Sequence, residues 1–322
     1  MTADTGPMKL IPRYLEKPWG GRRIGTVFGR ELAAGSLIGE SWELYDRPDG
    51  AAMIANGHFA GRDLASLRGG RPIPLLTKII DANDTLSVQV HPDEEAAAEL
   101  EGEPKTEAWY ILDVEPGATI YKGLKEGVGA PELLKALDLG TVADLLHVVT
   151  PEPGDLIYLP PGTVHAIGAG VLLFEVQQNS DTTYRLYDWD RPGLDGNPRE
   201  LHAKKAIRST DFSGPGDDRV LARVIEDDGR YRRTERVSCP EFVLEEQEVL
   251  GLVTFETARH GHEHWHVVFV LGGEGTIRAF RRNAEEVFFA PGDTLFLPAE
   301  HERYEIEPRP GRTLRLLTSY TP

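Results

Sequence analysis

The amino-acid sequence predicts a mainly β protein built from two barrels, with a small helical insertion in its N-terminal part. Three observations support this prediction. Short apolar runs rich in β-branched and aromatic residues recur between glycine and proline turns. A strand-forming motif occurs twice, with a polar, turn-rich segment between the two copies. Helical patterning is weak and local.

The predicted strands follow the apolar runs along the chain. Each run is short, and turn residues bound it, as expected for strands that bury side chains in a barrel. The runs cover residues 75–80, 86–90, 108–112, 156–159, 171–176, 242–244, 252–255, 266–271 and 294–297.

The predicted helices lie between these strands. One covers residues 94–101, which follow a proline. A second begins at Pro131, a residue suited to a first helical turn, and continues through residues 131–139 into 141–148. These stretches form the predicted helical insertion.

The repeated motif indicates that the barrel is duplicated. Residues 153–160 read Pro-Gly-Asp, an apolar run and a proline, and residues 291–298 repeat that order. A histidine follows each copy, His165 and His301. Between the copies, residues 213–229 are polar and rich in turn formers, so we expect a domain boundary there. We predict one domain at residues 1–229 and a second barrel at 230–322.

Composition excludes several classes of partner. A formal net charge of −17 disfavours binding to nucleic acid or to an anionic membrane. The sequence has no apolar run long enough to span a bilayer, and its first residues lack the basic and apolar regions of a signal peptide. The single cysteine, Cys239, cannot form an intrachain disulfide and is interpreted as an inert thiol. We therefore expect a cytoplasmic protein.

Four residues of the predicted first barrel could bind a metal. Gln89 and His91 alternate along a strand, so their side chains project to one face. Glu107 and His165 add a carboxylate and a second imidazole. This nitrogen and oxygen set suits zinc or a neighbouring divalent ion.

Three charged residues are candidates for catalysis. Lys105 stands two residues before Glu107 and shares its face, so a metal-bound molecule could meet both. Asp181 and Arg185 follow a long apolar strand. Metal charge near Lys105 would favour its neutral amine, which is the form that acts as a base.

Several ordered motifs resemble the type I mannose-6-phosphate isomerases, or phosphomannose isomerases, in their short bacterial form within the cupin superfamily. The likeness covers most of the chain, and many unlinked matches are more specific than one short motif. The matching segments are residues 17–21, 39–43, 87–93, 105–110, 160–166, 178–191 and 201–202.

This resemblance implies two cupin (jelly-roll) barrels and one zinc ion per chain. It implies zinc ligands at His91, Glu107 and His165, with Gln89 as the fourth. It further implies interconversion of mannose 6-phosphate and fructose 6-phosphate through an enediol-type intermediate, with Lys105 moving the proton and with Asp181 and Arg185 in the active site. We expect Asp181 to assist ring opening as an acid or base, and Arg185 to hold substrate oxygens or developing charge.

Two alternative functions remain at this stage. The two histidines and one carboxylate also match the iron site of a cupin dioxygenase, although Gln89 and Lys105 disfavour oxygen chemistry. A non-catalytic, sugar-binding regulatory protein is the other alternative, because fold alone does not establish activity.

Other questions stay open in the sequence. The run 260–266, rich in histidine, is interpreted as a barrel-edge strand rather than a second metal site, with His301 as its only obvious partner. Lys122, Arg13 and Arg22 are candidates for binding a phosphate. The sequence gives neither the preferred sugar nor the oligomeric state.

Overall fold

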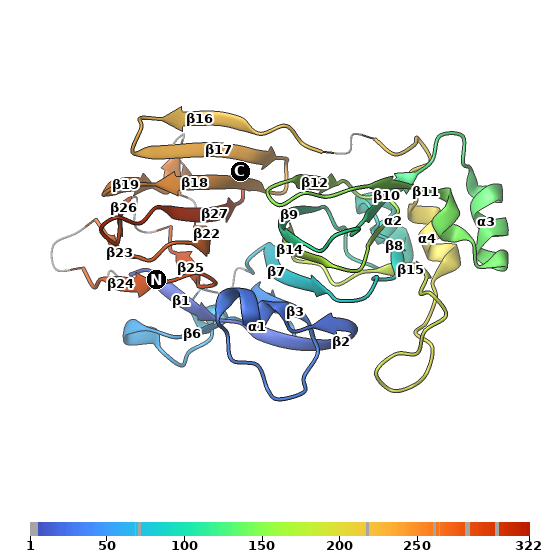
Figure 1. Cartoon of the computed structure of the whole chain (residues 1–322), viewed down its shortest axis with the longest axis horizontal. Helices are drawn as coiled ribbons and strands as arrows, with labels where there is room; N and C mark the ends of the chain where they lie inside the picture. Colours follow the sequence, from blue (N-terminus) through green and yellow to red (C-terminus); the bar gives the residue numbers. More distant parts are fainter. Residues whose placement is uncertain are drawn as a thin grey trace.

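The computed structural model describes residues 6–322 except 68, 70, 71, 217, 218, 260, 261, 264, 281–283 and 300–302. Figure 1 shows a mainly β molecule whose two halves lie side by side along the long axis. Each half is a sandwich of two antiparallel sheets of the cupin (jelly-roll) type. The predicted fold class is therefore confirmed.

The first sandwich contains the blue-to-green strands in the right half of Figure 1. Its larger sheet, sheet B, has the strand order β12 (Leu156–Leu159), β9 (Glu107–Val114), β14 (Val171–Gln178), β7 (Leu75–Ala82), β3 (Ile38–Leu44) and β2 (Arg13–Gly21). The facing sheet, sheet D, has the order β11 (Leu146–Val149), β10 (Ile120–Leu124), β13 (His165–Ile167), β8 (Val88–Val90) and β15 (Tyr184–Tyr187).

The second sandwich is built mainly from the C-terminal strands. Its larger sheet, sheet A, has the order β16 (Arg223–Asp227), β17 (Tyr231–Ser238), β18 (Val243–Val249), β27 (Leu314–Tyr320), β22 (His266–Gly272), β25 (Thr294–Leu297), β1 (Met8–Ile11) and β6 (Met53–Ile54). The facing sheet, sheet F, has the order β19 (Val253–Glu256), β26 (Arg303–Pro308), β23 (Gly275–Ala279) and β24 (Val287–Phe289). Two short ribbons pair β4 (Asp46–Arg47) with β5 (Gly50–Ala51), and β20 (Ala258–Arg259) with β21 (His262–Glu263).

The start of the chain crosses into the second sandwich. Strand β1 pairs with β25 in the register Met8↔Phe296, and β6 pairs with the other edge of β1. Strand β16 lies before residue 229 and pairs with β17 after it. The division into residues 1–229 and 230–322 stays a prediction. The β1–β25 and β16–β17 pairings join strands from opposite sides of that boundary.

The two sandwiches share a hydrophobic core, because the outer face of sheet B packs against sheet A. Ala108, Tyr110 and Phe174 face this shared core, whereas Trp109 between them faces the interior of the first sandwich. Phe174 stacks on Phe269 with ring centroids 5.1 Å apart. Sheet B is therefore covered on both faces, which explains why β7 is buried along its whole length.

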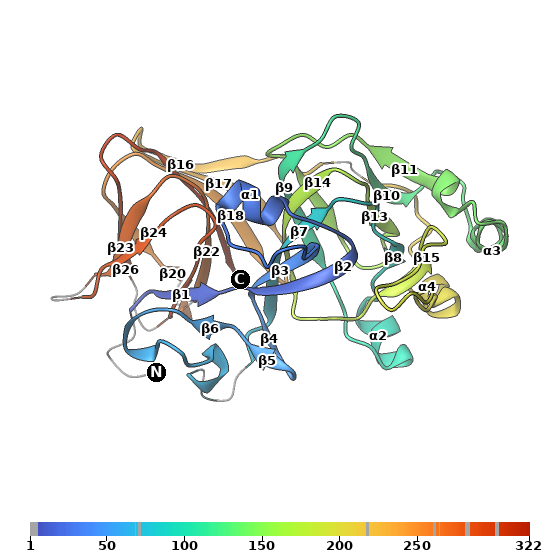
Figure 2. The same cartoon turned by 60° about the horizontal axis from the view of Figure 1, so that its bottom comes forward.

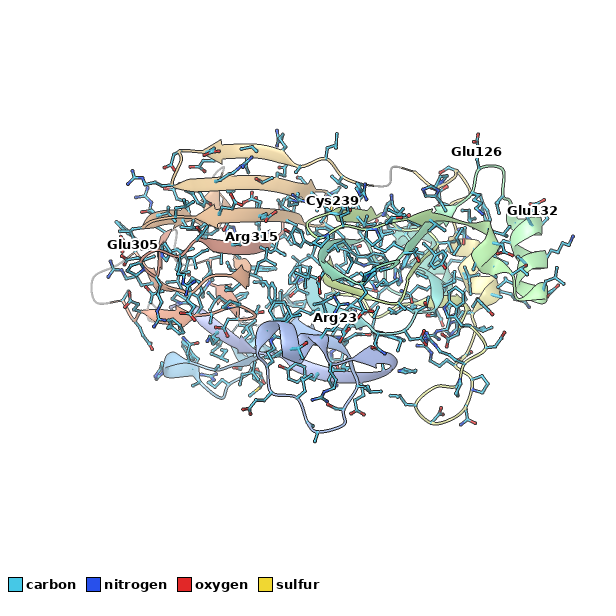
Figure 3. The ribbon with its side chains drawn as sticks, viewed as in Figure 1. Arg23, Glu126, Glu132, Cys239, Glu305 and Arg315 are labelled. Carbon is cyan, nitrogen blue, oxygen red and sulfur yellow. The ribbon has the colours of Figure 1, made fainter. Side chains whose placement is uncertain are left out.

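Polar contacts also join the two sandwiches. Glu43 is fully buried and accepts hydrogen bonds from Arg30 and, at 2.8 Å, from Thr294 Oγ1 of the second sandwich. Arg315, labelled in Figure 3, donates a hydrogen bond of 3.1 Å to the Tyr110 hydroxyl. These bonds fix the orientation of the sheets that the apolar contacts bring together.

Cys239 lies beside this interface (Figure 3). Burial, the largest effect on its thiol, raises the pKa of Cys239 to about 11, although nearby backbone amides oppose the shift. The thiol is therefore protonated near neutral pH, in agreement with its interpretation as inert.

The helices lie mostly at the far end of the first sandwich, and Figure 2 shows α2, α3 and α4 together there. They are α1 (Arg23–Phe28), α2 (Glu94–Leu100), α3 (Ala130–Leu139) and α4 (Ala203–Ser209), with 3₁₀ turns at Gly57–Phe59, Leu64–Ser66 and Val142–Leu145. Asp93 caps α2 by accepting from the amide of Ala96.

One helical prediction is wrong. Residues 141–148 do not continue α3, which ends at Gly140 in a left-handed conformation. They form a 3₁₀ turn and then β11, whose Val149 pairs with Ile120. Sheet pairing thus overrides the helical pattern in the last part of this stretch, where β11 contains Val148 and Val149. No helix of the described residues is long and apolar enough to cross a membrane.

Candidate metal centre and its cavity

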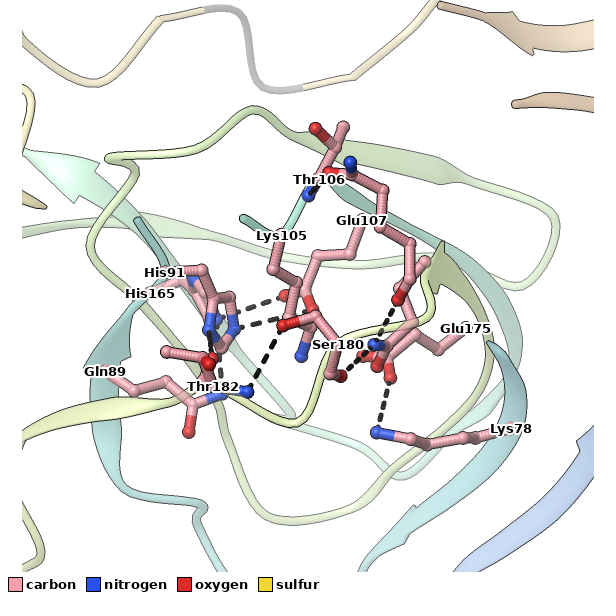
Figure 4. Close-up of polar contacts among 12 residues, drawn as sticks. Lys78, Gln89, His91, Lys105, Thr106, Glu107, His165, Glu175, Ser180 and Thr182 are labelled. Atoms are coloured by element: carbon pink, nitrogen blue, oxygen red, sulfur yellow. Dashed lines mark hydrogen bonds and ion pairs between the residues drawn. The ribbon is translucent and has the colours of Figure 1, made fainter. Parts of the chain in front are cut away.

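The predicted metal ligands come from three neighbouring strands. Gln89 lies on β8 and pairs directly with His165 at the start of β13, while His91 follows β8. Glu107 begins β9 in the facing sheet. Figure 4 shows the four side chains turned toward one another inside the first sandwich.

The donor atoms lie close enough to share one ion. One donor atom each from His91, Glu107 and His165 lies within 4.8 Å of the other two, and all three residues are buried. His165 Nε2 is 3.1 Å from Glu107 Oε1, and His91 Nε2 is 3.5 Å from Glu107 Oε2. The Gln89 amide reaches His165 Nε2 at 3.2 Å.

Backbone carbonyls orient both imidazoles. His91 Nδ1 lies 2.8 Å from the Thr182 carbonyl oxygen, and His165 Nδ1 lies 2.8 Å from the Thr163 carbonyl oxygen. A carbonyl only accepts, so each Nδ1 carries the proton and each Nε2 keeps its lone pair. The lone pairs are therefore available on the side that faces Glu107.

Among the described residues, His91 Nε2 and Glu107 Oε1 are buried without a hydrogen bond, and Glu107 Oε2 contacts Lys105 Nζ at 2.8 Å. Buried polar atoms are normally paired, so this convergence at one point calls for an explanation. A bound cation would satisfy both unpaired atoms, and the set of donors matches zinc.

The charge states suit metal binding. Burial, assisted by the nearby positive charge of Lys105, lowers the pKa of His91 to about 3 and keeps this imidazole neutral. Burial opposes ionisation of Glu107, but the adjacent Lys105 ammonium holds the pKa of this carboxyl well below its ordinary value. Neutral imidazoles and an ionised carboxylate are the forms that bind metals.

Lys105 contacts the same carboxylate. Its Nζ lies 2.8 Å from Glu107 Oε2, and the residue is only 5% exposed. Lys105 lies just before β9, where its backbone amide donates to the Pro92 carbonyl oxygen. The structure therefore places an amine directly beside the cluster of donor atoms.

A cavity of about 290 Å³ opens next to this cluster. Lys105, Asp181 and Arg185 all line it, so the three predicted catalytic residues share one space. Arg185 is held by hydrogen bonds to Ser87 Oγ at 3.3 Å and to the Glu200 carbonyl oxygen at 2.9 Å. Burial and the nearby Arg199 lower the pKa of Arg185.

Several further charged residues that line the cavity were not predicted from the sequence. Lys78 on β7 lies 3.1 Å from Glu175 and 3.8 Å from Glu40, and Glu40 also pairs with Lys17 at 2.9 Å. Burial opposes ionisation of Glu40, but Lys78 and Lys17 lower its pKa to about 2. Two signals were present in the sequence, since Lys78 and Glu175 each interrupt an apolar strand.

The cavity is locally cationic within an acidic chain. Among the described residues that line it, cations outnumber carboxylates by five to three: Lys17, Lys78, Lys105, Arg185 and Arg199 against Glu40, Glu175 and Asp181. The whole chain has a formal charge of −17. A local reversal of sign in a partly enclosed space favours an anionic ligand.

Other candidates from the sequence lie elsewhere. Lys122, Arg13 and Arg22 do not line this cavity. Arg13 pairs with Asp49, and Arg22 donates to backbone carbonyl oxygens of residues 33 and 36. In the histidine-rich run, residues 260, 261 and 264 lie outside the described residues, as does His301.

Comparisons with known proteins agree with this geometry. Residues 8–116 match the family model described as phosphomannose isomerase type I, catalytic domain. The mannose-6-phosphate isomerase of Streptococcus mutans is 35% identical over 91% of this chain and 92% of its own. Mannose-6-phosphate isomerase ManA of Bacillus subtilis is 36% identical over 94% and 96%. A crystal structure of mannose 6-phosphate isomerase from Bacillus subtilis superposes with a TM-score of 0.86 at 31% identity, covering 98% of this chain and 99% of that one.

Proposed function

The chain belongs to the type I mannose-6-phosphate isomerase family and is an isomerase, and from this premise we propose that it interconverts mannose 6-phosphate and fructose 6-phosphate with one zinc ion per chain. The reaction takes place in the cavity of the first sandwich, within the predicted catalytic domain at residues 1–229. The convergence of buried donor atoms from His91, Glu107 and His165 at one point carries the proposal.

Four residues would hold the zinc ion: Gln89, His91, Glu107 and His165. Both Nε2 atoms have free lone pairs, and a half-turn of the Gln89 amide brings its oxygen to the side of His165. When bound, zinc supplies a Lewis acid that draws electron density from the oxygens of the sugar.

Lys105 would move the proton. Aldose–ketose interconversion removes a proton from the carbon beside a carbonyl and returns one to the neighbouring carbon, through an enediol-type species. Lys105 is buried, lines the cavity and is held by Glu107 at 2.8 Å, so its amine has a fixed position. A positioned amine can accept and return the same proton once its neutral form is present.

Arg185 and Asp181 would act on the substrate from the mouth of the cavity. Arg185 holds substrate oxygens or developing negative charge, a role supported by its fixed guanidinium. Asp181 is exposed and lines the same cavity, so it can exchange protons with water while it assists ring opening. The excess of cations in the cavity supports a phosphorylated sugar over a free one.

The direct test is an assay of purified, metal-analysed protein against mannose 6-phosphate and free mannose. We expect conversion of the phosphorylated sugar, about one zinc per chain and much weaker turnover of mannose. Oxygen uptake with bound iron would instead support a dioxygenase, and sugar binding without turnover would support a regulatory protein. Either result would refute the proposed activity.

A further inference from the structure

The second sandwich repeats the strand order of the first. Sheet B runs β12-β9-β14-β7-β3-β2, and the corresponding strands of sheet A run β25-β22-β27-β18-β17-β16. Strands β12 and β25 carry the two copies of the repeated sequence motif. The two sandwiches can therefore be compared position by position from their strand registers.

The registers agree down to their irregularities. In sheet B the β14–β9 ladder shifts by one residue between Leu172 and Leu173, and in sheet A the β22–β27 ladder shifts at the corresponding place, between Val270 and Gly272. The β3–β7 ladder shifts between Trp42 and Leu44, and the β17–β18 ladder shifts between Glu235 and Val237. Matching bulges fix the correspondence without ambiguity.

This correspondence shows which residues of the second sandwich occupy the positions of the site residues in the first. His266 pairs with Leu297 as Glu107 pairs with Leu159, so His266 takes the place of Glu107. Glu245 pairs with Thr318 as Lys78 pairs with Glu175. When residue pairs are counted in the same way along the β17–β18 and β3–β7 ladders, Arg233 occupies the position of Glu40. The inner wall therefore keeps a buried ion pair, but with the positions of the charges exchanged.

A cavity of about 250 Å³ lies at this place in the second sandwich, close in size to the first. Arg233 Nε lies 2.9 Å from Glu245, which also accepts a hydrogen bond of 2.9 Å from the Tyr320 hydroxyl. His266 stacks on Tyr320 with ring centroids 4.5 Å apart and meets Phe255 edge-on at 5.2 Å. The cavity is thus lined by aromatic rings and by charged groups with fixed positions.

The charge of this second cavity is opposite to that of the first. Among the described residues that line it, Arg233 is the one cation, and the carboxylates are Glu226, Glu245 and Glu256. Arg233 is already paired with Glu245 and lies 3.5 Å from Glu226. A phosphorylated sugar would be repelled, whereas neutral hydroxyl groups can both donate to carboxylates and accept from a guanidinium.

We propose that the interior of the second sandwich is a separate binding site for an uncharged monosaccharide. Aromatic rings there pack against the apolar faces of the sugar, and the Arg233–Glu245 pair bonds to its hydroxyl groups. This site does not depend on the catalytic cavity, because its lining residues all come from strands β16, β17, β18, β19, β22 and β27.

The test uses the full zinc-loaded chain and calorimetric titration with mannose, glucose, mannose 6-phosphate and a quaternary amine. Thr254 lines the cavity and is itself exposed, so Thr254→Trp adds bulk at the edge of the cavity rather than in the core. Leu252→Trp adds the same bulk at a residue that is 54% exposed and does not line the cavity. We expect a neutral sugar to bind the parent and L252W equally, and to bind T254W at least about tenfold more weakly.

Both variants should keep the isomerase activity of the parent, which separates this test from that of the catalytic cavity. Equal affinity of T254W and L252W for neutral sugar would overturn the proposal, as would binding of only the phosphorylated sugar or the amine. If T254W does not fold, crystals of the parent soaked in mannose decide the question: electron density for a sugar beside Arg233 supports the site, and its absence there overturns it.

Discussion

Replacing Glu40 by glutamine tests the charged wall of the catalytic cavity. Glu40 lies between Lys17 at 2.9 Å and Lys78 at 3.8 Å, and its side chain is 12% exposed. These cations lower its pKa from 4.5 to about 2. Since each pKa unit is worth about 1.36 kcal/mol, the ionised carboxylate contributes about 3 kcal/mol to the free energy of unfolding.

The sign of the pH dependence follows from the lowered pKa. The contribution of Glu40 is complete above about pH 4.5 and is lost as the pH falls toward 2, because protons bind the unfolded state first. Urea unfolding followed by tryptophan fluorescence should show Glu40→Gln to be less stable at pH 6, with a difference that shrinks by about 3 kcal/mol toward pH 2. Glu16→Gln, an exposed change on β2, should track the parent. A constant difference between E40Q and the parent at all pH values would show that the charge of Glu40 does not stabilise the fold.

Three further outcomes are expected. Phe269→Ala should lower the free energy of unfolding by about 3–5 kcal/mol, because it leaves a cavity in the core between the sandwiches. Phe288 is 47% exposed, so Phe288→Ala should lower it little. Equal losses for the two variants in denaturant titrations would contradict this. Arg185→Lys should lower kcat on mannose 6-phosphate by about 100-fold, while Arg208→Lys on exposed α4 should not, as steady-state kinetics can check. Chelation of the metal should lower Tm reversibly, because metal at a thousandfold excess over Kd adds about 4 kcal/mol to the free energy of unfolding. Glu107→Gln should abolish the difference in Tm between chelated and zinc-loaded protein.

The sequence predicted those strands whose residues form continuous apolar runs. Strands β7, β9 and β14 belong to sheet B, which is buried on both faces, so their side chains are mostly apolar and the sequence identifies them as strands. Strand β17 was missed because half of its sequence, YRRTERVS, is charged. One of those charges, Arg233, faces the interior of the second sandwich, where Glu245 compensates it.

The sequence did not predict which distant segments pair as strands. Nothing in residues 8–11 indicates that they add a strand beside β25, nearly the whole chain away. Likewise, the pairing of Val149 with Ile120 depends on β10, which has no strong strand signal of its own.

The centre of the first cavity was more predictable than its wall. Gln89, His91, Glu107 and His165 lie within recognisable motifs, and the structure brings them together. Lys78, Glu175 and Glu40 come from separate strands, and only the sheet register reveals that they meet. Arg199 reaches the cavity from a loop, where it also pairs with Asp188 at 2.5 Å.

Proton transfer by Lys105 can be measured in zinc-loaded Lys105→Ala as exchange of the hydrogen on C2 of mannose 6-phosphate with deuterated water. We expect this variant to keep its zinc and to lose the exchange, whereas Lys204→Ala on exposed α4 should exchange like the parent. Exchange at the parental rate in K105A, with zinc still bound, would contradict a proton transfer through this amine.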